Sequence, residues 1–228
     1  MRFTLATAAL ALCGLASAGT ATAAPNGPYG VAYIGLRGSY VITDDGSTLG
    51  NGLAGFNYTQ SYDGGYATAA YIGWTVTEGI RLEFEGGFRS ADIDTVTVVT
   101  GDGITYFGGE VVDVGADVQA GTAMANLYYD MDIFGGDVVP WIGAGLGGAH
   151  VEYNVTDPLG VFSGNDKAWI FAYQLMAGLT FPISDGLSLT ASYHYFTTEH
   201  FDRTGTTGEV FKTDLTQHSV DLGIQWHL

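Results

Sequence analysis

Three polar residues near the end of the chain have the types that hydrolases use for nucleophilic catalysis: Ser192, His194 and Asp221. Ser192 and His194 are two residues apart, so they would share one face of a β-strand, and the final segment could place Asp221 beside them. Such a set would suit a lipid-modifying hydrolase. A triad is defined by geometry, however, and no oxyanion-hole motif accompanies these residues. Polar filling of an interior explains them equally well, and we expect no catalytic site.

A second group of residues could form ion pairs. The segment Ile80–Ser90 alternates charged and apolar side chains, which in a strand places the charges on one face. Because an unpaired charge out of water is costly, these charges must pair if the strand faces a narrow interior. The predicted lumen charge cluster consists of Arg37, Arg81, Glu83, Glu85 and Arg89. The cluster predicts an ion-paired plug, or alternatively a gate over a small water path.

The elements that must position these residues are strands, and the end of the chain shows the pattern most clearly. In Ser219–Leu228, every second residue is apolar, up to the carboxyl end. Strict two-residue alternation indicates a strand, and a charged opposite face is typical of the closing strand of a transmembrane β-barrel. The predicted closing-strand assembly signal consists of Val220, Leu222, Ile224, Trp226 and Leu228.

The rest of the chain repeats this pattern, so the fold class is predicted to be all-β, an eight-stranded antiparallel transmembrane β-barrel. The eight alternating segments are Tyr29–Ile42, Tyr66–Val76, Ile80–Ser90, Asp117–Tyr129, Val138–Glu152, Ala168–Phe181, Leu187–Phe196 and Ser219–Leu228. A soluble β-sandwich shows the same alternation. The barrel is favoured because one face is crowded with large apolar residues and aromatic residues collect near the segment ends, as in membrane girdles.

The connections between these segments alternate in length, as in outer-membrane barrels. Four long extracellular loops are predicted: Thr43–Gly65, Ala91–Ala116, Tyr153–Lys167 and Thr197–Gln217. The three short periplasmic turns are Thr77–Gly79, Asp130–Asp137 and Pro182–Gly186. Within the second loop we expect a hairpin of Thr95–Thr100 against Ile104–Gly108, because Gly101-Asp102-Gly103 favours a tight turn.

The start of the chain has the layout of an export signal. Arg2 is followed by an apolar run and then by small residues that end in Ala21-Thr22-Ala23. This arrangement predicts a signal peptide at residues 1–23, cleaved after Ala23, and an outer-membrane β-barrel domain at residues 24–228. The only cysteine, Cys13, lies within the signal, so no thiol chemistry is expected after cleavage.

Composition excludes several classes of partner. The chain has 7 Lys and Arg against 24 Asp and Glu, a formal net charge of −17, so binding of nucleic acid through a basic surface is excluded. Acidic turns such as Asp44-Asp45-Gly46 could bind divalent cations but lack a spaced ligand set, so we expect no metal and no cofactor. The expected partners are outer-membrane lipid and lipopolysaccharide, the barrel-assembly machinery and a surface ligand bound by the loops. We expect a monomer.

Five short motifs in order resemble one family across the predicted barrel domain: Tyr33–Arg37, Asn126–Asp130, Pro140–Gly147, Tyr173–Gly178 and Tyr193–Phe196. They are similar to the OmpA-like, opacity-porin-family small outer-membrane β-barrels, which are surface antigens of Gram-negative bacteria. Two residues depart from the family pattern. His194 stands where such barrels usually have an inward Arg, and Leu228 replaces the usual terminal Phe.

The resemblance implies a structural, adhesin-like or antigen-like role in the outer membrane, with no catalytic site to transfer to this chain. With the ion-paired plug, it predicts a surface-interaction protein whose lumen is closed. A narrow porin for small solutes is the first alternative. A lipid-modifying barrel enzyme is the second.

Overall fold

The structure is a computed structural model that describes residues 31–44, 46–50, 57–62, 64–99, 112–156, 164–204 and 210–228. The predicted signal peptide and its cleavage site lie outside these ranges. Within them, no helix is long and apolar enough to cross a membrane.

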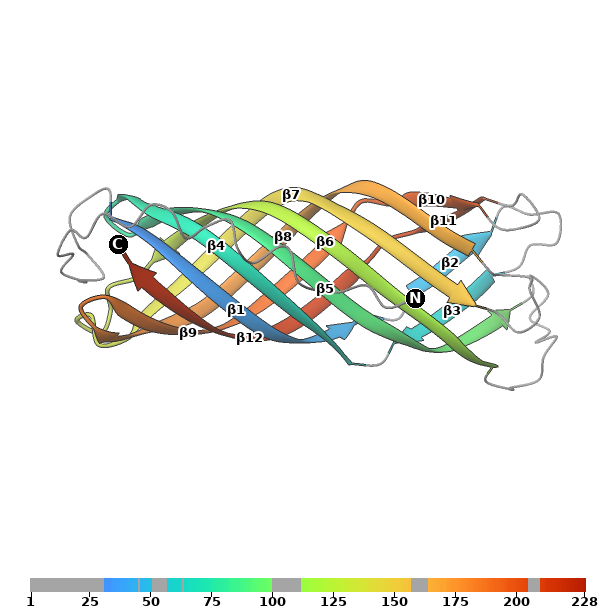
Figure 1. The fold of residues 1–228 in the computed structure, drawn as a ribbon, viewed down its shortest axis with the longest axis horizontal. Helices are drawn as coiled ribbons and strands as arrows, with labels where there is room; N and C mark the ends of the chain where they lie inside the picture. Colours follow the sequence, from blue (N-terminus) through green and yellow to red (C-terminus); the bar gives the residue numbers. More distant parts are fainter. Residues whose placement is uncertain are drawn as a thin grey trace.

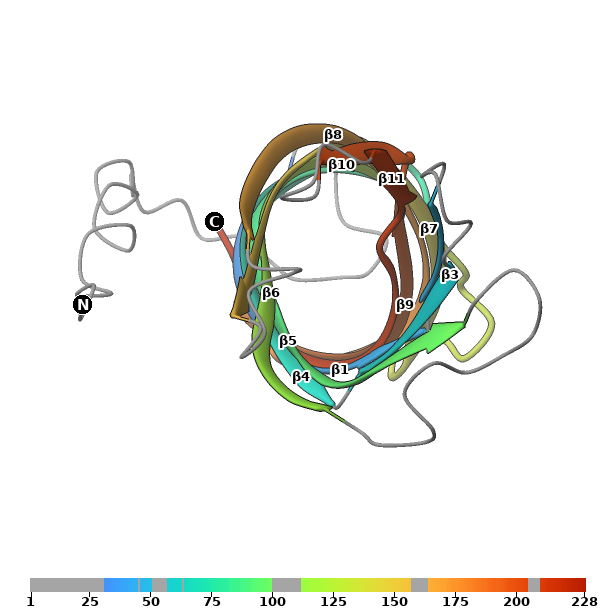
Figure 2. The ribbon, with the colours of Figure 1, turned by 90° about the vertical axis from the view of Figure 1, so that its right-hand side faces the viewer.

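Eight long strands form a closed ring, and its outline can be followed in Figures 1 and 2. They are β1 (Ala32–Thr43), β4 (Gly65–Thr77), β5 (Ile80–Val99), β6 (Val112–Asp130), β7 (Val139–Thr156), β8 (Gly164–Ser184), β9 (Leu187–Thr198) and β12 (Thr216–His227). β4 to β9 follow one another around the ring, and β1 closes it by pairing with β4 on one side and β12 on the other. All pairings are antiparallel, so the predicted eight-stranded barrel is confirmed.

The register shows how far the strands are staggered. A single row of paired residues can be followed once around the ring from Tyr33. Its members are Tyr33, Gly73, Glu83, Asn126, Gly145, Gln174, Phe196, Gln217 and Thr43. The row returns to β1 at Thr43, 43 − 33 = 10 residues beyond its start. This offset is the shear of the barrel. Together with the number of strands, the shear sets the tilt of the strands and gives a narrow interior that side chains can fill.

Four short strands lie in segments that the sequence analysis assigned to loops. They are β2 (Gly46–Gly50), β3 (Asn57–Tyr62), β10 (Phe201–Thr204) and β11 (Val210–Thr213). β3 pairs with the outer part of β5, and β2 joins β3 to β11. The predicted loops Thr43–Gly65 and Thr197–Gln217 are therefore partly wrong. Their polar composition predicted loops, but strands beyond the membrane need no apolar face, and pairing satisfies their backbone groups.

The other two predicted loops are also shorter than expected. β5 extends to Val99 and β6 begins at Val112, while β7 extends to Thr156 and β8 begins at Gly164. Thr95 and Val96 pair with Asp113 and Val112 of β6, so the predicted pairing of Thr95–Thr100 with Ile104–Gly108 is wrong for these two residues. The β5–β6 ladder continues outward, with one register shift. This pairing leaves neither of the two facing strand edges exposed. Residues 104–108 lie outside the described residues.

The turns at the opposite end are short. Gly79, with a φ of 72°, ends the turn between β4 and β5, a left-handed conformation that favours glycine. The predicted turn Pro182–Gly186 is shorter than expected, because β8 continues to Ser184 through a register shift after Pro182.

The two faces of the wall differ as the alternation predicts. On the outside, Leu222 is 71% exposed and Phe84 is 51% exposed. On the inside, Glu83 is 2% exposed and Asp221 is 1% exposed. The outer face is thus an apolar band and the inner face contains the charged side chains.

Candidate functional site in the barrel lumen

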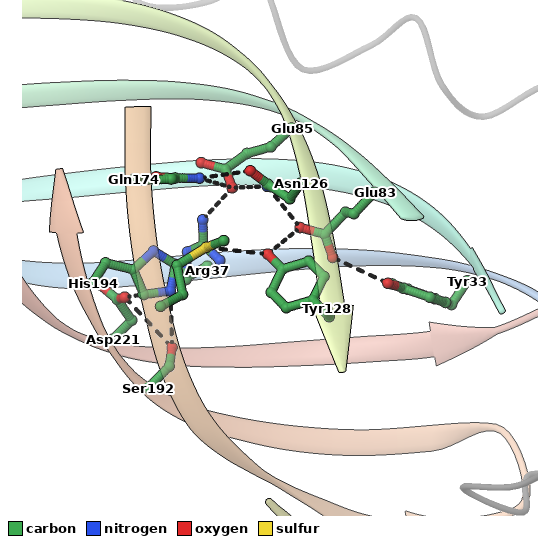
Figure 3. A network of polar contacts seen from close by, with 11 residues as sticks. Tyr33, Arg37, Glu83, Glu85, Asn126, Tyr128, Gln174, Ser192, His194 and Asp221 are labelled. Carbon is green, nitrogen blue, oxygen red and sulfur yellow. Dashed lines mark hydrogen bonds and ion pairs between the residues drawn. The ribbon is translucent and has the colours of Figure 1, made fainter. Parts of the chain in front are cut away.

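The carboxylate of Glu85, on β5, is contacted by side chains from three other strands inside the barrel (Figure 3). Arg37 on β1 forms a salt bridge with it, with 2.5 Å between Nη2 and Oε2. On the same oxygen, Asn126 of β6 donates a hydrogen bond of 3.0 Å and Gln174 of β8 donates one of 3.4 Å. Strand alternation turns all four side chains inward, and the register brings them to one level.

Glu83 lies one inward position closer to the turn end and has a different set of partners. Its carboxylate accepts hydrogen bonds from the hydroxyl of Tyr128 at 2.9 Å, the hydroxyl of Tyr33 at 3.3 Å and the amide of Asn126 at 3.3 Å (Figure 3). These donors are neutral. Glu83 is therefore held by hydrogen bonds, whereas Glu85 is held by a buried ion pair.

Arg81 forms a second ion pair, with a residue that the sequence analysis had assigned to a turn. Its guanidinium donates two hydrogen bonds, of 2.7 and 2.8 Å, to the carboxylate of Asp130 at the end of β6. The same group donates to the Tyr33 hydroxyl at 3.1 Å and lies over the ring of Tyr128, 4.9 Å from its centre. Two parallel bonds between an arginine and a carboxylate are a strong, directional contact. Predicting the Arg81–Asp130 pair would have required the strand register, which decides the residues that lie near Arg81.

Arg89 differs from the other members of the lumen charge cluster. It lies nearer the loop end, and its guanidinium stacks on the ring of Phe196, 4.3 Å from the ring centre. Among the described residues, no carboxylate lies within ion-pair distance of Arg89, and its Nη1 is buried without a hydrogen-bond partner. Within these residues, the expectation that all lumen charges pair is therefore wrong for Arg89.

Ser192, His194 and Asp221 do come together, because Ser192 and Asp221 are directly paired across β9 and β12. His194 Nε2 lies 3.3 Å from Ser192 Oγ and 3.1 Å from Asp221 Oδ2 (Figure 3). In a catalytic triad, the serine and the acid contact opposite ring nitrogens. Here both contact the same nitrogen, and Nδ1 is buried with no partner among the described residues. The geometry is that of polar filling rather than of a proton relay.

The space left between these side chains is small. A cavity lined by residues that include Arg81, Trp141 and Gln225 has a volume of about 10 Å³. This is close to the minimum that one water molecule needs. The indole N–H of Trp141 is buried there without a partner, which is consistent with such a water. In the described part of the chain, no group of three or more His, Cys, Asp or Glu side chains could hold a metal ion.

The residues of the closing-strand assembly signal lie on the outer face of β12 and at the residue after it. Val220 is 62% exposed, Leu228 is 41% exposed, and the backbone N–H of Leu228 donates to Ala32 of β1. These residues line the seam where the last strand meets the first. Their role in assembly remains a prediction.

Comparison with known sequences gives the family. Residues 7–227 match the outer membrane protein beta-barrel domain family. The chain belongs to this family. It is an outer-membrane β-barrel of the Gram-negative type, as the sequence motifs indicated.

Two relatives match parts of this outer-membrane barrel. An outer membrane protein of Gluconacetobacter diazotrophicus is 31% identical over 144 residues, which are 58% of this chain and 35% of the relative. An uncharacterized protein of Brucella abortus is 37% identical over 82 residues, 32% of this chain and 28% of the relative. The matches thus span about a third of the length of these relatives.

Solved structures support the fold. OprG of Pseudomonas aeruginosa superposes with a TM-score of 0.60 at 15% identity, covering 90% of this chain and 99% of OprG. The outer membrane protein AlkL gives a TM-score of 0.51 at 21% identity, covering 94% of both chains. At these identities the likeness concerns the barrel fold alone.

Proposed function

We propose that this protein is a non-conducting outer-membrane barrel that acts through its outer surface, in a structural, adhesin-like or antigen-like role. The observation that supports a closed lumen is the convergence on Glu85 of side chains from β1, β6 and β8. β5 and β8 lie three strands apart in the ring of eight, so this contact crosses the bore.

The network resists opening because its parts depend on each other. Removing one partner of a buried ion pair leaves an uncompensated charge and typically costs about 3–5 kcal/mol. The Arg37–Glu85 and Arg81–Asp130 pairs both have side chains that are at most 10% exposed. Thermal motion would therefore open a solute path through them only rarely.

The interaction role is assigned to the loop end of the barrel. A closed lumen leaves outer-membrane lipid, lipopolysaccharide and a surface ligand as the partners that the protein can reach. The barrel-assembly machinery would recognise the closing strand during insertion. The membrane-spanning ring has no unpaired strand edge, which favours a monomer. We assign no catalytic role, in keeping with the His194 geometry.

Planar-bilayer recording with the purified, refolded protein tests this proposal. We expect conductance near the baseline of protein-free lipid at both low and high salt. Arg37→Ala with Glu85→Ala should raise conductance, because the double change removes the central contact without leaving a lone charge. Leu36→Ala, on the outer face of the same strand, is the matched control and should stay closed. Steady conductance of the unaltered protein would instead support the narrow-porin alternative.

A further inference from the structure

Among the lumen arginines that the structure describes, Arg89 has an incomplete set of partners. Arg37 and Arg81 each hold a carboxylate, at 2.5 and 2.7 Å respectively. Arg89 is equally enclosed, with 6% of its surface exposed, and its Nη1 has no hydrogen-bond partner. The nearest acids of the network are already engaged, because Glu85 binds Arg37 and Asp221 lies against His194.

The described neighbours of Arg89 supply no other carboxylate. Its direct ladder partners are Ala67 on β4 and Ala120 on β6, both buried. Its guanidinium reaches Phe196 on β9, which is four strands away in the ring of eight and so on the opposite wall. A cation–π contact offsets only part of the cost of burying a guanidinium. Among the described residues, the site thus has a cation and an unused N–H donor but no anion.

Beside and beyond Arg89, the inner wall on β5, β6 and β7 is apolar. Ala91 pairs with Val118, and Ala120 pairs with Val151; all four side chains are at most 2% exposed. A group bound to Arg89 would therefore have methyl groups on its β5–β7 side and the ion-paired network on its turn-end side. A doubly charged, strongly hydrated anion is disfavoured in such a place, because its desolvation cost is high.

We propose that Arg89 is the binding group of a lumenal site for a small monocarboxylate with a short alkyl chain, which enters from the loop end. The carboxylate would accept hydrogen bonds from the guanidinium, as the carboxylates of Glu85 and Asp130 do from Arg37 and Arg81. The alkyl chain would lie against the apolar wall. This inference goes beyond the proposed function, since a site above the network can be occupied whether or not the lumen conducts.

Arginine side-chain NMR of the refolded protein tests the site. The chain has 5 arginines, so few signals arise, and Arg89→Lys assigns the signal of Arg89. Sodium butyrate is titrated at constant, high ionic strength, with sodium chloride and sodium phosphate as comparison salts. We expect a saturable shift of the Arg89 signal with butyrate, a weaker response to either comparison salt, and constant signals from Arg37 and Arg81.

A second variant separates binding from general effects of salt. Phe196→Leu removes the ring that competes for the guanidinium and keeps an apolar wall, so butyrate should bind roughly two- to tenfold more tightly. Heat-dependent migration on a detergent gel verifies that each variant is folded. An Arg89 signal that does not move, or that moves in parallel with the other arginines, overturns the proposal. An equal response to chloride overturns the assignment to carboxylates.

Discussion

Glu85→Gln is the most informative single change in the lumen. It removes the charge that compensates Arg37 while keeping the shape of the side chain. The Arg37 and Glu85 side chains are 7% and 2% exposed, so the remaining guanidinium cannot move into water. Breaking a buried pair in this way typically costs about 3–5 kcal/mol in the free energy of unfolding. The barrel should still assemble, because its outer face is unchanged.

Glu83→Gln is the matched control, since Glu83 is on the same strand face and is equally buried. Its hydrogen bonds come from two hydroxyls and an amide, and hydroxyls can rotate to suit an amide. We expect a loss of about 1–2 kcal/mol. Urea unfolding in lipid vesicles, followed by tryptophan fluorescence, should separate the two variants by about 2 kcal/mol, or roughly thirtyfold in the unfolding equilibrium constant.

The double variant Arg37→Met with Glu85→Met separates the effect of an uncompensated charge from the effect of side-chain shape. If the cost of Glu85→Gln comes from an uncompensated charge, replacing both partners by apolar residues should recover most of the lost stability. Equal losses for Glu85→Gln and Glu83→Gln would contradict the assignment of the ion pair. A double variant that loses as much as the sum of its single changes would show that shape, and not charge, dominates.

Three further predictions concern the membrane and the topology. Phe84→Arg or Leu82→Arg should impair assembly, because arginine on the lipid face near the midplane costs roughly 2–4 kcal/mol; normal insertion in a vesicle folding assay would mean that the two faces are reversed. Cysteines introduced at loop positions should react with an impermeant biotin reagent on intact cells, and cysteines in the turns should not; labelling of the turns would reverse the topology. The loop-end positions are Asn51, Asp102, Gly164 (the first residue of β8) and Gly205, and the turn positions are Glu78 and Asp185. The mature protein should begin at Ala24; amino-terminal sequencing that recovers Met1 would contradict this.

The inward direction of the lumen charge cluster could be predicted from the sequence alone. Successive residues of a strand point to opposite faces, so the charges of Ile80–Ser90 had to share one face, and the apolar residues of Ser219–Leu228 had to share one as well. This is a local property of the extended backbone. The number of strands followed from the same pattern. The polar strands β2, β3, β10 and β11 did not, because they lack the apolar alternation of a strand that has one face in lipid.

Which inward residues meet was decided by the tertiary structure. Partners across the lumen depend on the shear of the closed ring, and a shift of register would move every residue of a strand relative to its neighbours. For this reason Arg81 contacts Asp130, Glu83 meets hydroxyls, and Ser192 and Asp221 reach the same nitrogen of His194. Arg89 has the same alternation as Arg81, yet the register gives it alanines as neighbours. The sequence by itself determined which charges are inside; the stagger of the ring decided which of them have a partner.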